Sequence, residues 1–300
     1  MKHVTVNASS GRYDIVIRPG IFADSEPLQE LRSVLAGRSV LVVTDTNVGV
    51  LYGEAASRCI AAAGARSCDT FTVPAGERSK NLDTLEALYH FALSAGLDRT
   101  SVTVALGGGV VGDVAGFFAA TFMRGIRFVQ LPTSLLAQID SSVGGKVGVD
   151  LPEGKNLVGA FKQPDLVVMN LSCLGTLPLR ELRCGLAEMV KYGVILDADL
   201  FGELESHVPS LVPVPDLGLY GPLIRQCCRL KASIVEQDER ESGRRAILNY
   251  GHTFGHALEA LGQYTGLNHG EAIAIGMCMA ADLAVALGMC PAESAHRQET

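Results

Sequence analysis

Residues 101–123 read SVTVALGGGVVGDVAGFFAATFM, and this stretch decides the fold class. It opens with β-branched and apolar residues typical of a buried strand, and it closes with an apolar run suited to a helix. Glycines and Asp113 separate the two parts, so the stretch is unlike a membrane-spanning segment. A buried strand, a glycine loop and a helix in this order indicate one unit of an α/β fold.

The same alternation continues on both sides as far as about residue 177. Further strands are predicted over 3–8 and 13–20 as a hairpin, over 39–46, within 69–77, over 127–133 and over 165–170. Helical patterns occupy the segment up to about residue 64, residues 79–96 and residues 134–145. Strands that alternate with helices in this way predict a parallel, Rossmann-like sheet covered by helices.

Beyond residue 177 the strand signal disappears. Residues 177–195, 220–241, 257–266 and 271–288 all have helical periodicity. We therefore predict an α/β domain over residues 1–177 and an all-α domain over residues 178–300. An enzyme with two such domains would place its site between them.

Composition excludes several classes of protein. The chain of 300 residues has 48% apolar residues and a net charge of −7, which describes a packed globule without a surface for nucleic acid or anionic membrane. Residues 1–20 lack the apolar core of a signal peptide. The eight cysteines form no Cys-x-x-Cys pair, so they are expected to be reduced thiols of a cytoplasmic protein.

The glycine loop has the pattern Gly107-x-Gly109-x-x-Gly112 between a strand and a helix. Glycines let the backbone approach a pyrophosphate, and the helix N-terminus adds donors and positive potential. A tight turn without a ligand is the alternative. An acid suited to hold the ribose is absent about 20 residues further on. Asp45, at the end of the strand over 39–46, is the better candidate, with Glu77 and Lys80 at another strand end.

Several charged groups are flanked by glycines and small residues between residues 131 and 156. They include Asp140, Lys146, Lys155 and Asn156. An ammonium group beside an open backbone is suited to bind phosphate or carboxylate. Surface lysines in a hairpin are the alternative.

The helical half contains a possible metal site. Glu188 and Lys191 lie three residues apart in an apolar helix. They form either a buried pair with a function or a surface ion pair. Catalytic zinc commonly has a carboxylate, two imidazoles and an open position. Glu188 with any two of His252, His256 and His269 would supply that set, and spacing alone favours His252 with His256.

Six motifs in order make the chain similar to a known family. They are PAGERSK (74–80), LGGGVVGD (106–113), FMRGIRFVQLPTSLLAQIDSSVGGKVGVDLPEGKNLVGAF (122–161), RCGLAEMVKYG (183–193), RAILNYGHTFGHALE (245–259) and NHGEAIAIGM (268–277). From about residue 38 to 285 the chain resembles the 3-dehydroquinate synthases, a family of sugar-phosphate cyclases. The resemblance implies NAD bound by the first domain and a zinc or cobalt ion beside the second.

The resemblance also assigns three sets of residues. The metal ligands would be Glu188, His252 and His269. NAD would contact Asp45, Glu77, Lys80, Gly107, Gly108, Gly109, Val110, Val111, Gly112, Asp113, Thr133, Ser134, Lys146, Lys155 and Thr176. The phosphate and carboxylate of the substrate would contact Arg124, Asp140, Lys146, Asn156, Lys191, Lys231, Arg245, Asn249 and His256.

The implied reaction is a phosphate-eliminating cyclisation by a carbon–oxygen lyase. It converts 3-deoxy-D-arabino-heptulosonate 7-phosphate to 3-dehydroquinate and phosphate in the shikimate pathway, in a cytoplasmic homodimer. Family members continue for several tens of residues with more helix and another basic substrate contact, so the helical domain over 178–300 is expected to be short. The alternatives are a related cyclase for aminodehydroquinate, 2-deoxy-scyllo-inosose or an epi-valiolone, a metal-dependent polyol dehydrogenase, and a non-catalytic paralogue. A simple dehydrogenase would have no need of the phosphate-binding lysines.

Overall fold

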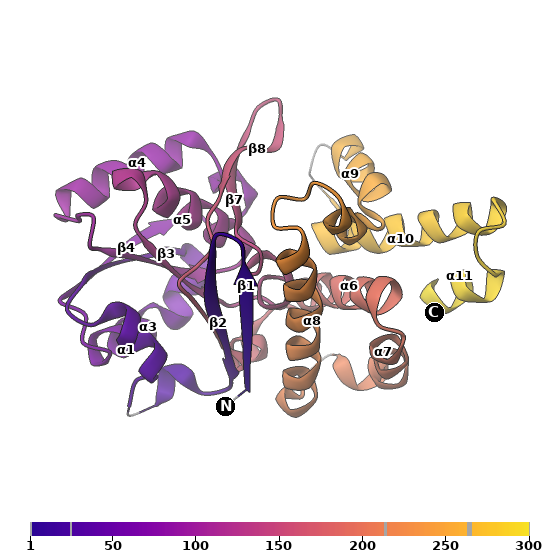
Figure 1. Ribbon diagram of the computed structural model, residues 1–300, viewed down its shortest axis with the longest axis horizontal. Coiled ribbons are helices and arrows are strands. Elements are labelled where there is room, and N and C mark those ends of the chain that lie inside the picture. Colours follow the sequence, from indigo (N-terminus) through magenta and orange to yellow (C-terminus); the bar gives the residue numbers. More distant parts are fainter. Residues whose placement is uncertain (1, 25, 213–214, 263–265, 300) are drawn as a thin grey trace.

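The structure, a computed structural model, describes residues 2–24, 26–212, 215–262 and 266–299. A seven-stranded sheet has the strand order β1-β2-β9-β6-β5-β3-β4. Its β1–β2 end faces the helical second half of the chain (Figure 1). Its strands are β1 (Lys2–Ala8), β2 (Gly11–Arg18), β3 (Ser39–Asp45), β4 (Ser67–Val73), β5 (Val102–Gly107), β6 (Arg127–Pro132) and β9 (Leu166–Asn170). A separate antiparallel hairpin consists of β7 (Lys146–Leu151) and β8 (Gly154–Phe161).

Helices cover the sheet and then form the second half of the chain. The helices of the first half are α1 (Gln29–Leu35), α2 (Thr46–Val48), α3 (Glu54–Ala62), α4 (Leu82–Ser94) and α5 (Gly109–Thr121). Those of the second half are α6 (Leu179–Leu196), α7 (Ala198–Leu211), α8 (Leu217–Gln237), α9 (His252–Leu261), α10 (His269–Ala286) and α11 (Ala292–Glu299). Among the described residues, no strand follows β9.

Strand direction brings the polar strand ends together. Within the seven-stranded sheet, neighbouring strands from β2 to β4 pair in parallel, and β1 is antiparallel to β2. The chain runs outward from β3 to β4 and then returns to β5 on the other side of β3. Such a reversal opens a ligand-binding position at the carboxyl ends of the two strands. Asp45 ends β3 and Gly107 ends β5, so both lie at this position.

One hydrophobic cluster joins the two halves of the chain. Alternate residues of β2, including Tyr13, Ile15 and Ile17, are buried on one face of the sheet. They belong to the same cluster as Tyr220 and Ile224 of α8. Burial of large apolar side chains stabilises by about 1.5–3 kcal/mol each, so this shared core holds the helical half against the β1–β2 hairpin.

The structure confirms the parallel sheet and the change to helices, and it differs in detail. The β7–β8 hairpin was not predicted as strands, because its glycines and exposed apolar positions give no clear alternation. The helices α1, α7 and α11 were also missed. The predicted helix over 134–145 includes a π-helical turn at Ala137–Ser141, and residues 263–265 of the predicted segment 257–266 lie outside the described residues.

The helix α10 is apolar and largely exposed. It is the one helix in the described ranges that is long and apolar enough to cross a membrane, with 33% of the apolar window buried. Ile275, Met279, Leu283 and Leu287 follow one another every four residues, with exposed fractions from 40% to 65%. One helix of this kind is weak grounds for a membrane span, since helices of soluble proteins have the same length and composition.

Candidate active site

Three potential metal ligands meet where α6, α9 and α10 approach one another. Glu188 lies in the middle of α6, while His252 and His269 are the first residues of α9 and α10. The Oε1 atom of Glu188 lies 3.7 Å from Nε2 of His252 and 3.6 Å from Nε2 of His269. Potential ligand atoms of the three residues all lie within 4.8 Å of one another. A carboxylate and two imidazoles at these distances suit one divalent ion.

The two imidazoles direct the same nitrogen toward Glu188. The Nδ1 atom of His252 lies 3.1 Å from the backbone oxygen of Tyr250. The Nδ1 atom of His269 lies 3.6 Å from Oε1 of Glu259. A proton held on each Nδ1 leaves the lone pair of each Nε2 directed at the centre of the triad. This arrangement is typical of histidines that bind metal ions.

Burial of Glu188 provides an independent test of the fit. Its side chain is fully buried, and in the described part of the chain no hydrogen-bond donor reaches Oε1. The other oxygen pairs with Nζ of Lys191. Burial acts to raise the pKa of Glu188, but the Lys191 cation and the neighbouring His269 lower it overall. A buried, ionised carboxylate requires compensation by cations, so a divalent ion fits these residues.

The pKa values of the two histidines shift in opposite directions. Burial and the Lys191 cation lower the pKa of His252 to about 4. Burial acts in the same direction on His269, but the carboxylates of Glu188 and Glu259 outweigh it and raise the pKa of His269 to about 9. His252 is therefore a neutral ligand at pH 7, and the two carboxylates hold a positive charge at His269. Binding of a metal ion would displace this proton.

His256 lies beside the triad on a more exposed face of α9. Its ring centroid lies 5.3 Å from that of His252, edge-on. It forms a second possible ligand group with Glu259 and His269. In that group Oε1 of Glu259 already lies 3.5 Å from Nζ of Lys155, and His256 is exposed. Oε1 of Glu188 accepts no hydrogen bond in the described part of the chain, so the geometry favours the first group and leaves His256 available to a bound substrate. Helical spacing placed the two histidines on one face but could not separate their roles.

Next to the triad lies a buried cluster around Asp140. The π-helical turn carries Asp140, whose Oδ1 accepts a hydrogen bond of 2.7 Å from the hydroxyl of Tyr192 and pairs with Nζ of Lys231. Lys231 also donates to the backbone oxygen of Asp140 at 2.6 Å. Burial acts to raise the pKa of Asp140, but the cations of Lys231 and Lys191 lower it overall. The two lysines thus bring positive charge to the side of the metal triad.

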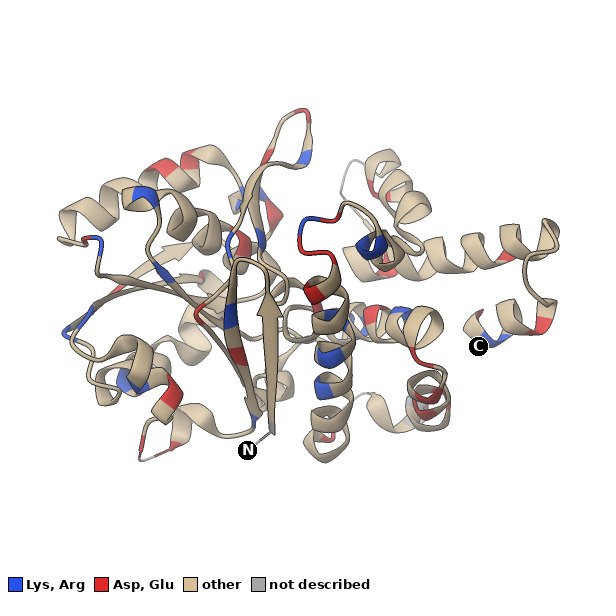
Figure 2. Cartoon of the chain, in the orientation of Figure 1, with Lys and Arg blue, Asp and Glu red and all other residues tan. Residues whose placement is uncertain are grey.

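The loop between α8 and α9 brings further charged groups to the hairpin. Lys146, at the start of β7, pairs with Oε2 of Glu241, and the amide of Asn249 donates to Oε1 of Glu241 at 2.9 Å. Arg245 is buried and donates to the backbone oxygens of Glu239 and Gly144 at 2.6 and 3.2 Å. Lys146, Arg245 and Asn249, which are far apart in the sequence, therefore lie in one basic region. Residues of both charges occur on α8 and on this loop (Figure 2).

A second polar cluster lies at the carboxyl ends of the strands. Nζ of Lys80 lies 2.7 Å from Oδ2 of Asp113 and also donates to Oδ1 of Asn156. Asp113 lies in the first turns of α5, directly after the glycine loop. Burial raises the pKa of Asp113 to about 6, although Lys80 stabilises its charge. Two predicted NAD contacts, Lys80 and Asp113, therefore lie beside Asn156, a predicted substrate contact on the hairpin.

Other predicted NAD contacts have structural partners as well. Asp45 caps α2 and accepts hydrogen bonds from the backbone nitrogens of Asn47 and Val48 through one oxygen, Oδ1. The hydroxyl of Thr176 bonds to that of Tyr52 at 2.5 Å. Lys146 and Lys155 lie on the β7–β8 hairpin. The other members lie at or after the ends of β4, β5 and β6. They are Gly107, Gly108, Gly109, Val110, Val111 and Gly112 after β5, Thr133 and Ser134 after β6, and Glu77 after β4.

Arg124 differs from the other predicted substrate residues. It is exposed and precedes β6, so it lies toward the amino ends of the parallel strands. Within the described residues, no hydrogen bond or ion pair joins it to the clusters above. A role for Arg124 within one copy of the chain receives no support from this geometry.

Sequence reasoning missed three residues that the structure places in the site. Tyr192 binds Asp140, Glu241 joins Lys146 to Asn249, and Glu259 faces His269. Glu259 follows His252 by seven residues, two helical turns, which places both on one side of α9 and could have identified it. Tyr192 follows Glu188 by four residues, one helical turn, and could have been identified in the same way, whereas Glu241 has no comparable signal in the sequence.

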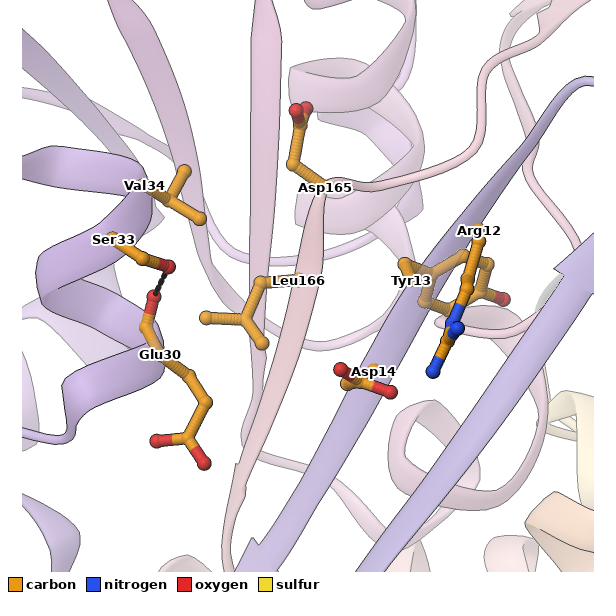
Figure 3. A pocket seen from close by; sticks show the side chains of 8 residues that line it. All are labelled: Arg12, Tyr13, Asp14, Glu30, Ser33, Val34, Asp165 and Leu166. Atoms are coloured by element: carbon orange, nitrogen blue, oxygen red, sulfur yellow. Dashed lines mark hydrogen bonds between the residues drawn. The ribbon is translucent and has the colours of Figure 1, made fainter.

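A cavity of about 290 Å³ lies elsewhere, between α1 and the start of β9 (Figure 3). Arg12, Tyr13, Asp14, Glu30 and Asp165 are among its lining residues. Asp165 accepts a hydrogen bond of 2.9 Å from the backbone nitrogen of Phe128 and so fixes the start of the β6–β9 pairing. The cavity lies at the amino ends of the strands and plays no part in the site described here.

Comparison with known proteins agrees with the geometry. The 3-dehydroquinate synthase N-terminal family matches residues 70–184, and the 3-dehydroquinate synthase C-terminal family matches residues 185–300. The chain belongs to the 3-dehydroquinate synthase family. A 3-dehydroquinate synthase of Pelotomaculum thermopropionicum is 52% identical over 294 residues, which cover 96% of this chain and 77% of that protein.

Solved structures of related cyclases share the fold of this 3-dehydroquinate synthase family member. A 2-deoxy-scyllo-inosose synthase complexed with carbaglucose-6-phosphate, NAD+ and Co2+ superposes with a TM-score of 0.90 and 29% identity, over 99% of this chain and 81% of that one. A 2-epi-5-epi-valiolone synthase from Streptomyces hygroscopicus with NAD+ and Zn2+ bound has a TM-score of 0.85 and 30% identity, over 95% and 78% of the two chains.

Proposed function

We propose that this protein converts 3-deoxy-D-arabino-heptulosonate 7-phosphate to 3-dehydroquinate and phosphate, with NAD and one divalent metal ion, Zn or Co. The observation that carries the proposal is the metal triad beside a basic region. Glu188, His252 and His269 converge within 4.8 Å, and Lys191 and Lys231 lie next to them. A metal site for alcohol oxidation would suffice for a polyol dehydrogenase, whereas the adjacent cations suit a substrate with a phosphate and a carboxylate.

The chain's residues have separate tasks in this proposal. When bound, NAD supplies a hydride acceptor that is regenerated, and the metal ion supplies a Lewis acid for the oxygen that is oxidised. Glu188, His252 and His269 hold the ion. The substrate carboxylate and phosphate bind among Lys146, Asn156, Lys191, Lys231, Arg245, Asn249 and His256. NAD binds along Asp45, Glu77, Lys80, Gly107–Asp113, Thr133, Ser134, Lys146, Lys155 and Thr176.

Elimination requires orientation of the phosphate more than an extra base. The proton on the neighbouring carbon passes to a phosphate oxygen, and the electron pair of that carbon–hydrogen bond becomes a carbon–carbon double bond. The carbon–oxygen bond to phosphate breaks, and its electron pair leaves with the phosphate. Lys146 is half-exposed at the hairpin base and His256 is exposed beside the triad, so both can orient the phosphate. Orientation of this kind lowers the barrier without a further acid–base group.

The proposal extends to organisation of the molecule. We assign NAD binding to residues 1–177 and binding of metal and substrate to residues 178–300, with Lys146 and Asn156 reaching the substrate from the first domain. A cytoplasmic homodimer without nucleic-acid or membrane partners accords with the net charge of −7. Arg124, which lies apart from the site of its own chain, is available to the site of the second copy. Sedimentation equilibrium at micromolar concentration should yield twice the mass of 31.7 kDa.

One assay tests the activity. Purified protein with NAD+ and Zn2+ or Co2+ should release phosphate from the heptulosonate phosphate without net accumulation of NADH. Steady NADH production from a polyol would instead identify a dehydrogenase, and phosphate release from another sugar phosphate alone would identify a different cyclase. Retention of NAD and metal without turnover of any of these would refute an enzymatic function.

A further inference from the structure

Glu259 is a buried carboxylate that the mechanism above leaves without a task. It lies near the end of α9 with an exposed fraction of 5%. Its Oε1 atom lies 3.6 Å from Nδ1 of His269 and 3.5 Å from Nζ of Lys155. A carboxylate is rarely buried in this way without paired charges. Its two neighbours therefore define what it does.

The contact with His269 concerns the nitrogen that faces away from Glu188. Nε2 of His269 lies 3.6 Å from Glu188, and Nδ1 lies 3.6 Å from Glu259. An acceptor at Nδ1 keeps the proton there, so Nε2 retains its lone pair for a metal ion. His252 obtains the same orientation from the backbone oxygen of Tyr250. Only for His269 does a replaceable side chain supply the acceptor.

The contact with Lys155 reaches the other half of the molecule. Lys155 belongs to β8 of the hairpin, and its Nζ lies 3.5 Å from Oε1 of Glu77 as well as 3.5 Å from Glu259. Glu77 follows β4 at the carboxyl ends of the strands. Glu259 is thus held between a lysine from the sheet side and a histidine of the triad. Because contacts on both sides fix the position of Glu259, its Oε1 oxygen can fix the plane of the His269 ring.

We propose that Glu259 is a positioning residue that sets the tautomer and ring orientation of His269 for binding a divalent metal ion. The proposal rests on the metal assignment of the proposed function, and it adds a residue that does not itself bind the ion. Partners of metal-bound histidines typically change metal affinity by about 10–100-fold when they are lost. Glu259→Gln should therefore weaken Co2+ binding about 10-fold or more, and Glu259→Ala should weaken it further, with one ion still bound per chain.

The test measures Co2+ affinity by competition with a chelator, and follows the absorption bands of the bound ion. Glu188→Gln, which removes a direct ligand, should lose more affinity than either Glu259 variant. Glu86→Gln is the matched control, because Glu86 is exposed and lies 3.9 Å from the surface histidine His90. Thermal unfolding in chelator, where no ion contributes, measures the effect of Glu259→Gln on the fold itself and so separates loss of metal from loss of fold.

Two results would overturn the assignment of Glu259. A Co2+ affinity of Glu259→Gln within twofold of the wild-type affinity, together with an unchanged absorption spectrum of the bound ion, would show that His269 needs no such partner. Loss of binding as complete as in Glu188→Gln would show that Glu259 is itself a ligand, in the group with His256 and His269. Failure of the wild-type protein to bind Co2+ at all would refute the metal site of the proposed function, and this inference with it.

Discussion

Gly270 determines how closely α10 approaches α6, and its replacement should disturb the metal triad. A Cβ atom at this position would lie 2.3 Å from Cα and 2.5 Å from the carbonyl oxygen of Cys184, which are backbone atoms of α6. Ordinary contacts begin at 3.4 Å, so in Gly270→Ala the helices must separate locally by about 1.1 Å. His269 precedes Gly270 and Glu188 follows Cys184 by one helical turn, so this displacement falls on two of the three ligands.

The expected cost has two parts. Overpacking of this kind destabilises by about 1–3 kcal/mol, which should appear in urea unfolding with a chelator present. Metal sites tolerate deviations of only about 0.2 Å, so a shift near 1 Å should weaken metal binding at least 10-fold. At a free metal concentration of 100 times the wild-type Kd, the ion should stabilise the wild type by about 2.7 kcal/mol and the variant by about 1.4 kcal/mol or less.

Urea unfolding with and without Zn2+ measures both parts. Gly202→Ala is the control, because Gly202 lies in α7 and no atom lies within 4 Å of its would-be Cβ. It should raise the free energy of unfolding by up to about 1 kcal/mol and leave the stabilisation by Zn2+ unchanged. If Gly270→Ala and the wild type have the same free energy of unfolding and the same Zn2+ affinity, the close packing of α10 on α6 does not hold the metal ligands in place.

Two further predictions concern buried charges. Burial acts to raise the pKa of Glu239, but hydrogen bonds from Ser9 and Ser10 lower it to about 2. Since this pKa lies below the ordinary 4.5, the stabilisation is complete above pH 4.5 and is lost as the pH falls toward 2. This stabilisation amounts to at most about 3 kcal/mol. Glu239→Gln should therefore flatten the pH dependence of the free energy of unfolding, measured in urea, between pH 4.5 and 2. An unchanged slope would contradict this. Asp140→Asn leaves Lys231 buried without its ion-pair partner and should lower the free energy of unfolding by about 3–5 kcal/mol. If the effects of Asp140→Asn and Lys231→Met add in a double-mutant cycle, the ion pair is excluded as the cause.

Much of the architecture follows from local pattern. The strand over 39–46, the glycine loop after 101–106 and the helices α6, α8 and α10 were predicted correctly, because each has a continuous apolar run or a clear helical period. The β7–β8 hairpin was missed for the opposite reason. Its strands are glycine-rich and partly exposed, and their pairing depends on packing against α5 that local sequence does not encode.

Sequence by itself determined the residue types of the site and their order along the chain. It also placed His252 and His256 on one helical face, because the helical period is a local property. Tertiary structure alone decided which of them faces Glu188, since α6, α9 and α10 meet only after the chain has folded. The buried Glu188 oxygen lies 3.7 Å from His252, while His256 is exposed beside the triad. The contacts that orient the imidazoles, from Tyr250 to His252 and from Glu259 to His269, likewise form only on packing, because tautomer and ring direction depend on neighbours in space.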